Sequence, residues 1–160
     1  MEPPEPYPPD QPPPPPPGRD VMLQLPGGIW AAGERVTAIS GLVLMLSAFM
    51  GWYVGSEQGP TIAVIGWHTG VIGKLVFLLG LAIVVLVVLR ELGIELPATV
   101  PEGLVVIVLG SLATILVLVR LISIPDSFFP ENGRGIGIWI SLLAALGVIV
   151  GGLLRAGEEL

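Results

Sequence analysis

The chain has 160 residues, of which 52% are hydrophobic and 12% charged, and its formal net charge is -6. Soluble domains carry roughly a quarter charged residues, so these proportions indicate that lipid surrounds most of the chain. The acidic balance argues against a nucleic-acid partner, which requires basic side chains. The sequence has no cysteine, which excludes disulfides, thiolate metal sites and cysteine nucleophiles.

The chain begins with a proline-rich tail, MEPPEPYPPDQPPPPPPGRD, which has eleven prolines before Gly18. This composition favours polyproline II and prevents a packed core, so we expect residues 1–20 to be disordered. The tail is either a docking ligand for a cytoplasmic partner, since PxxP spacing recurs in it, or a solvated spacer. Residues 21–35 contain VMLQLPGGIW and are expected to form an interfacial segment against the lipid headgroups.

Four long apolar runs follow, separated by short segments that contain glycine, proline and acids. At about 1.5 Å per residue, a run of nineteen residues covers most of a hydrocarbon core of roughly 30 Å. The runs are apolar on every face, which disfavours a water-soluble bundle. The sequence therefore predicts an all-α integral membrane protein: an antiparallel four-helix bundle over 36–155, followed by a short acidic tail over 156–160. The predicted spans are 36–54, 71–89, 104–122 and 136–154.

The basic residues near the ends of the spans predict the orientation of the bundle. Four of them fall on the side of the two termini, namely Arg19, Arg35, Arg90 and Arg155. The other side has Arg120, Arg134 and, just inside the second span, Lys74. The sequence thus predicts a multi-pass protein of the cell membrane with both termini in the cytoplasm.

The stretch GWHTGVIGK, residues 66–74, contains the only histidine and the only lysine of the chain. Six positions separate His68 from Lys74, which places them about 240° apart around a helix, so they cannot share one helical face. Lys74 lies about one turn inside the apolar run. It is a candidate functional charge if it faces the bundle interior, and the alternative is that its long stem carries the ammonium back to the headgroups.

The polar and ionisable side chains of the predicted spans give no basis for catalysis. Serines 40, 47, 111 and 141 lie within the predicted spans without a neighbouring base, and serines in such helices more often bond to backbone. No span has a central acid or histidine, which disfavours a pump or coupled transporter. We therefore predict no catalytic residue, no cofactor and no metal site.

Small residues at four-residue spacing indicate where helices approach one another closely in lipid. They serve either the internal packing of one bundle or a homodimer interface, and the pairs are Ser47 with Gly51, Gly110 with Thr114, and Gly147 with Gly151. Aromatic residues near the ends of the spans are predicted to anchor the protein at the membrane interface. These are Trp52, Tyr53, Trp67 and Trp139.

Several short patterns accompany the spans: Gly51-Trp52-Tyr53 at the end of the first, Gly66-Trp67 before the second, and LVLVRLISIP over 116–125. A loop with Arg134 then leads into GIWISLLAALGVIVGGLLR over 137–155. With these features the chain resembles small uncharacterised four-span membrane proteins of actinobacteria and related high-GC bacteria, over roughly residues 36–155. The resemblance implies a protein of the cell membrane and assigns no activity.

The function predicted from these features is that of a non-enzymatic scaffold or accessory subunit. Its bundle would sit in the lipid bilayer against a membrane-protein partner or a second copy, while the proline-rich arm would meet a cytoplasmic partner. The alternative is a small channel or transporter component in which Lys74, Arg120 or Glu102 lines a vestibule.

Overall fold

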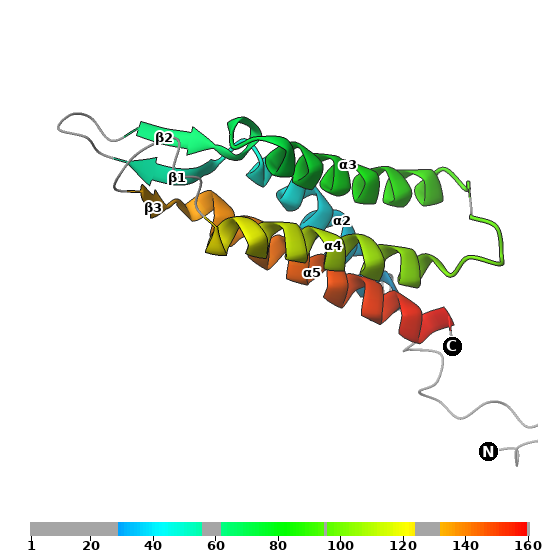
Figure 1. The fold of residues 1–160 in the computed structure, drawn as a ribbon. Coiled ribbons are helices and arrows are strands. Elements are labelled where there is room, and N and C mark those ends of the chain that lie inside the picture. The colour runs from blue at the N-terminus through cyan, green and yellow to red at the C-terminus, as the bar shows by residue number, and fades with distance from the viewer. Residues whose placement is uncertain (1–28, 56–61, 95, 124–131, 160) are drawn as a thin grey trace, which may run out of the picture.

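The computed structural model describes residues 29–55, 62–94, 96–123 and 132–159. This part of the chain contains four helices that lie alongside one another in alternating directions (Figure 1). Their bounds are Ile29–Ser47 for α2, Val71–Glu91 for α3, Glu102–Ile122 for α4 and Ile136–Glu159 for α5. Within the described residues, α3, α4 and the first 22 residues of α5 are long and apolar enough to cross a membrane. The chain is therefore a mostly helical membrane protein, as predicted, but the small sheet described below departs from the predicted all-α fold.

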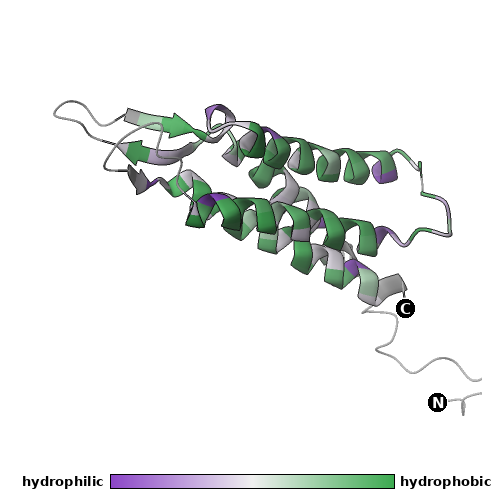
Figure 2. Ribbon diagram, viewed as in Figure 1, coloured by the Kyte–Doolittle hydropathy of each residue, from purple (hydrophilic) through white to green (hydrophobic). Residues whose placement is uncertain are grey.

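Apolar side chains fill the interior of the bundle and also cover the outer faces of its helices. The interior is filled by residues such as Leu44, Ile83, Val117 and Val148, each with no exposed surface. Large apolar side chains also cover the outer faces, and Leu143, for example, is 69% exposed. Figure 2 shows this apolar character along the length of α3 and α4. An outer surface of this kind needs an apolar solvent, because soluble monomers rarely expose contiguous apolar area on this scale.

Glycines set how closely the helices approach. A Cβ added to Gly80 of α3 would lie 2.6 Å from the backbone nitrogen of Met45 in α2, and one on Gly151 of α5 would lie 2.4 Å from Thr37 Oγ1 in α2. A Cβ on Gly110 of α4 would lie 2.9 Å from Val148 in α5. Helix pairs α2–α3, α2–α5 and α4–α5 are thus tightly joined, whereas α3 and α4 pack less closely against each other.

A small antiparallel sheet covers one end of the bundle, opposite the end where α2 begins and α5 ends (Figure 1). The strands are β1 (Gly51–Gly55), β2 (Ile62–Ile65) and β3 (Asn132–Arg134), in the order β2-β1-β3. A short 3-10 turn, η1 (Gly66–His68), joins the sheet to α3. The sheet links the end of α2 to the start of α5, because β1 follows the former and β3 precedes the latter.

The predicted first span, 36–54, needs correction. The helix runs over Ile29–Ser47, and residues 51–55 form β1 instead. The indole Nε1 of Trp52 donates a hydrogen bond to the Ser47 carbonyl at 2.9 Å, so a side chain satisfies one of the last helical carbonyls. β1 then pairs with both β2 and β3. These two strands would lack their partner if the helix continued through residues 51–55.

The bounds of other predicted segments also change. The short acidic tail expected over 156–160 is helical as far as Glu159, because α5 continues past the predicted limit of 154. Gly103 at the start of α4 supports this last turn, since an added Cβ there would lie 2.6 Å from the backbone nitrogen of Ala156. Residues 29–35 of the expected interfacial segment belong to α2. The proline-rich tail and residues 21–28 lie outside the described residues.

Candidate functional site

One charged side chain from each helix meets at the end of the bundle where α2 begins and α5 ends. Arg90 of α3 places Nη1 2.9 Å from Glu102 Oε2 of α4 and Nε 3.7 Å from Glu34 Oε1 of α2. Arg155 of α5 places Nη2 3.5 Å from the same Glu102 oxygen and 3.7 Å from Glu34 Oε1. Each arginine therefore contacts both carboxylates. We call these four residues the four-charge network, and its formal charges sum to zero.

Arg155 is the most deeply placed member of the four-charge network. Its side chain is 3% exposed, against 38% for Arg90. Its Nε is buried and has no hydrogen-bond partner among the described residues. A buried guanidinium is tolerated only when opposite charges compensate it. The two carboxylates supply that compensation, so the network fixes four helices relative to one another at this end.

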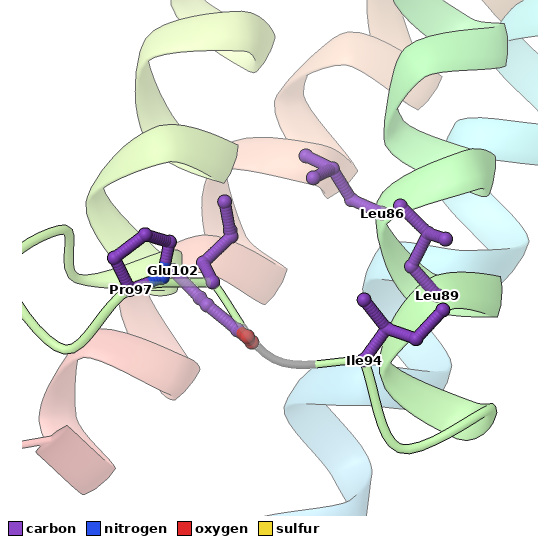
Figure 3. Close-up of a pocket in the computed structure, with 6 residues that line it drawn as sticks. Leu86, Leu89, Ile94, Pro97 and Glu102 are labelled. Atoms are coloured by element: carbon purple, nitrogen blue, oxygen red, sulfur yellow. The ribbon is translucent and has the colours of Figure 1, made fainter.

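An apolar cleft of about 120 Å³ opens beside the four-charge network, between α3 and α4. Leu86 and Leu89 line it from α3 and Glu102 from α4, and the connecting segment adds three more residues, Ile94, Leu96 and Pro97. Figure 3 shows these side chains reaching into the gap from both helices. Glu102 thus belongs to the cleft and to the four-charge network at once.

At the opposite end, polar contacts tie α4 to the sheet. The Tyr53 hydroxyl of β1 donates to the Arg120 carbonyl at 2.9 Å, and Arg134 Nε of β3 donates to the Leu121 carbonyl at 2.7 Å. The Arg120 guanidinium in turn donates through Nη2 to the Thr69 carbonyl just before α3. The last carbonyls of α4, which lack partners within the helix, are thus satisfied by the strands.

Burial raises the pKa of Tyr53 above its ordinary value of 10.0, while the charges of Arg120 and Arg134 act in the opposite direction. Desolvation dominates because the side chain is almost completely enclosed and the phenolate would lose its hydration there. The phenol therefore stays protonated at neutral pH and keeps its role as a donor.

Lys74 does not face the interior of the bundle. Its side chain is exposed, and its Nζ lies 5.8 Å from the centroid of the Trp67 ring. Trp67 also stacks on Phe49, with centroids 5.6 Å apart, and meets Phe77 edge to face at 5.3 Å. This placement fits the alternative in which the ammonium reaches toward headgroups. His68 is exposed as well, so the two rare side chains do not build an enclosed site.

Most of the residues predicted to pack helices do lie at helix contacts inside one chain. Gly110 faces α5, and Gly147 and Gly151 face Ser40 and Thr37 of α2. Thr114 Oγ1 donates to the Gly110 carbonyl at 2.8 Å within α4. These contacts are those of the internal-packing alternative.

Ser47 and Gly51 lie on either side of the turn after α2. Ser141 Oγ of α5 lies 2.7 Å from Ser47 Oγ, and Ser47 Oγ donates to the Leu44 carbonyl at 2.6 Å. Gly51 needs correction, because it belongs to β1 and not to a helix, and an added Cβ there would lie 3.1 Å from Ala63 of β2.

The predicted interface anchors divide into two pairs. Trp52 and Tyr53 are 0% and 1% exposed, so they fill the junction of sheet and bundle and do not reach headgroups. That prediction is corrected by their position in β1. Trp139, at the start of α5, is 49% exposed, and Trp67 is half-buried in η1, which precedes α3. The second pair stays a prediction for interface anchoring.

The described residues contain no group of three His, Asp or Glu side chains that could hold a metal ion. The buried hydroxyls of Ser47 and Ser141 bond to each other and to the carbonyls of Leu44 and Gly137. These hydroxyls join α2 to α5, and their partners do not include a general base.

The sequence contained a signal for the four-charge network that was not used. Each helix has at least one charged residue near the same end of the bundle, and the four that meet alternate in sign along the chain as Glu34, Arg90, Glu102 and Arg155. In an antiparallel bundle such an alternation places opposite charges side by side. Arg90 and Arg155 enter the prediction only through the orientation of the bundle and Glu34 does not enter it, so the contacts among these residues are not predicted.

Comparison of the chain with protein-family models, with curated proteins and with solved structures gives no match. The resemblance to small four-span proteins of actinobacteria therefore stays a prediction from the sequence patterns. Three candidate membrane-spanning helices indicate a membrane protein.

Proposed function

We propose that the protein is a non-enzymatic scaffold or accessory subunit of the cell membrane, in which all four helices cross the bilayer. α2 has nineteen residues and extends about 28 Å at 1.5 Å per residue. It packs closely against both α3 and α5. Eighteen positions separate Glu102 from Arg120 on α4, or about 27 Å, which matches a hydrocarbon core of roughly 30 Å.

The observation that carries the proposal is the closed apolar interior between two polar ends. Side chains such as Leu44, Ile83 and Val148 fill the centre without exposed surface. The buried hydroxyl side chains of the described helices, Thr37, Ser47 and Ser141, donate to carbonyls of their own helices, and the buried Arg155 lies at one polar end. Conduction requires a wet or polar path, so this interior supports a scaffold over a channel.

The charged candidates for a vestibule point to the same conclusion. Glu102 is engaged by two arginines, Arg120 donates to the Thr69 carbonyl, and Lys74 lies over Trp67 on the outside. Side chains that line an ion path must face a continuous path through the bundle. These three lie at the two ends of the bundle or on its outer surface instead.

The proline-rich arm would contact the cytoplasmic partner. It precedes Ile29, where α2 begins, so it leaves the bundle at the end that carries the four-charge network and the end of α5. The four basic residues counted on this side favour its placement in the cytoplasm. A proline-rich segment loses little conformational entropy on docking to an aromatic groove.

The decisive experiment is chemical crosslinking in the native membrane followed by affinity purification, using the full chain and a variant that lacks residues 2–18. We expect the full chain to retain a specific protein that the shortened chain loses, while both reach the membrane in equal amounts. If the shortened chain retains the same proteins as the full chain, the proposed role of the arm is wrong. In parallel, ion flux through liposomes that contain the purified protein is expected to equal that of empty liposomes. Flux that disappears on Lys74→Leu would instead establish the channel alternative.

A further inference from the structure

The contact between α3 and α4 differs from the other three helix contacts of the bundle. Glycines bring α2, α5 and their neighbours together, as at Gly80 against Met45, Gly151 against Thr37 and Gly110 against Val148. The nearest atoms to Gly80 of α3 and Gly110 of α4 thus belong to α2 and α5. Between α3 and α4 the packing is looser, and at the end with the four-charge network the two helices leave the apolar cleft open.

With the four helices across the bilayer as proposed above, the cleft lies at the depth where a lipid headgroup meets its acyl chains. Its walls are formed by leucines 86 and 89 near the end of α3, and its rim by Glu102 at the start of α4. α3 and α4 are also the helices that expose most of their surface to the surroundings, with 28% and 22% of their apolar windows buried against 44% for α5. An apolar cleft on this lipid-facing side opens to acyl chains of the adjacent leaflet.

Glu102 at the rim of the cleft and Arg90, which is bonded to it, carry the charges that select the headgroup. Arg90 and Glu102 lie 2.9 Å apart, and both remain partly exposed, at 38% and 19% of their side chains. A phosphate finds a donor in Arg90, and an ammonium finds an acceptor in Glu102. The four-charge network is neutral overall, so a headgroup with net negative charge gains no net attraction from it. The carboxylates of the network would repel such a headgroup.

We infer that the cleft binds one phospholipid with a zwitterionic, primary-amine headgroup of the phosphatidylethanolamine class. One acyl chain lies in the cleft between α3 and α4, against Leu86 and Leu89, while the phosphate bonds to Arg90 and the ammonium bonds to Glu102. A choline headgroup carries the same charges but has no N–H to donate, so it binds less well. The inference rests on the proposed location in a bilayer and is independent of the proposed scaffold role.

The test is native mass spectrometry of the purified full chain in micelles that contain equal amounts of phosphatidylethanolamine, phosphatidylcholine and phosphatidylglycerol. We expect one retained lipid per chain, with the ethanolamine lipid preferred about tenfold over each of the other two, since a hydrogen bond to a charged group changes affinity by roughly that factor. This comparison uses the unaltered protein, so a folding defect cannot imitate the result. Equal retention of the three lipids, or of none, would overturn the inference.

Two matched substitutions locate the lipid. Leu86→Trp fills the cleft and is expected to abolish retention of the lipid. Val88→Trp is the control, because Val88 of α3 is 49% exposed and does not line the cleft. This variant is expected to leave retention unchanged. Circular dichroism melting of both variants shows that they fold. If both variants kept the lipid, or if a second copy of the chain replaced the lipid in the spectrum, the cleft would not be its site. Loss of the arm's protein partner leaves these outcomes unaffected, so the two proposals fail separately.

Discussion

The hydroxyl of Tyr53 in β1 donates a hydrogen bond to the carbonyl of Arg120, 67 positions later in the chain and in the last turn of α4, at 2.9 Å. This contact joins β1 to a helix that is not its neighbour in the chain. The bond is local in space and distant in sequence, and it closes one end of the bundle. The four-charge network closes the other end by a different means.

Replacing Tyr53 with Phe tests the contact at the sheet end. The folded-state pKa of Tyr53 is raised, so between the unfolded value near 10 and the folded value the native state binds more protons than the unfolded state. The contribution of Tyr53 is therefore complete below about pH 10 and is lost as pH rises through the folded pKa. At pH 7, Tyr53→Phe should lower the free energy of unfolding by about 1 kcal/mol.

Thermal unfolding in detergent at pH 7 and above pH 10 provides the measurement. The wild type should lose stability in the alkaline range, and the phenylalanine variant should lose less, because it has no phenol to ionise. Trp139→Phe, on an exposed aromatic of α5, is the matched control and should behave as the wild type. An identical alkaline loss in the Tyr53 variant would show that another group causes it.

Arg155→Leu tests the four-charge network. The change leaves two carboxylates to share Arg90, and removal of one partner from a buried ion pair typically costs about 3 kcal/mol. The partial exposure of Glu34 and Glu102, 27% and 19% of their side chains, keeps the expected loss near or below that figure. Arg35→Leu removes an exposed arginine of α2 and should change stability by no more than about 0.5 kcal/mol. Equal effects of the two variants would contradict a structural role for the network.

Glycine substitutions separate close helix contacts from open positions. A Cβ on Gly151 would lie 2.4 Å from Thr37 Oγ1 and 2.9 Å from the Thr37 backbone nitrogen, so Gly151→Ala should destabilise the bundle by about 1–3 kcal/mol. Gly157, also in α5, has no atom within 4 Å of its added Cβ. Gly157→Ala should stabilise the helix by up to about 1 kcal/mol, because alanine is the better helix former.

The same glycines distinguish a fold contact from an interface between copies. Because Gly147 and Gly151 face α2 of their own chain, Gly147→Leu with Gly151→Leu should reduce the amount of folded monomer. Size-exclusion chromatography with crosslinking reads both species. A folded monomer that had lost only a crosslinked dimer would show that these glycines serve a second copy.

Lys74→Leu is expected to leave abundance and topology unchanged. The ammonium is exposed and contacts the Trp67 ring at 5.8 Å, and such a contact contributes about 0.5–1 kcal/mol at an exposed site. Cysteine accessibility at each end of the bundle, together with protein level in membranes, provides the measurement. An inverted or mixed topology would assign Lys74 a role in orienting the chain.

The helices could be predicted from the sequence because lipid requires long apolar runs whose backbone is satisfied internally. The runs that became α3 and α4 contain no competing signal, and their predicted bounds differ from the observed ones by only two residues at one end. The first run differs because hydropathy does not distinguish a helix from a strand that is buried on both faces. GWYVG and IAVI, separated in the sequence by six residues that include Gly59-Pro60, carry the aromatic and β-branched residues typical of a hairpin.

The candidate site was predicted less well because its parts are far apart in sequence. The contacts of Glu34 with Arg90 and Arg155 depend on which helices become neighbours, and the spacing of charges along one run cannot reveal that order. Trp52 and Tyr53 were assigned to the membrane interface from their residue type alone. Their burial follows from the pairing of β1 with β3, in which Tyr53 pairs with Arg134, 81 positions later in the chain.

The central position of β1 in the sheet has a consequence for biosynthesis. β1 and β2 leave the ribosome early and can pair at once, but β3 is made only after α3 and α4 are complete. Until then the second edge of β1 has unpaired backbone groups, which attract other strands. The sheet is therefore complete only after the preceding helices have been made and placed. A chain that stops before Asn132 exposes an open strand edge that quality-control proteases can recognise.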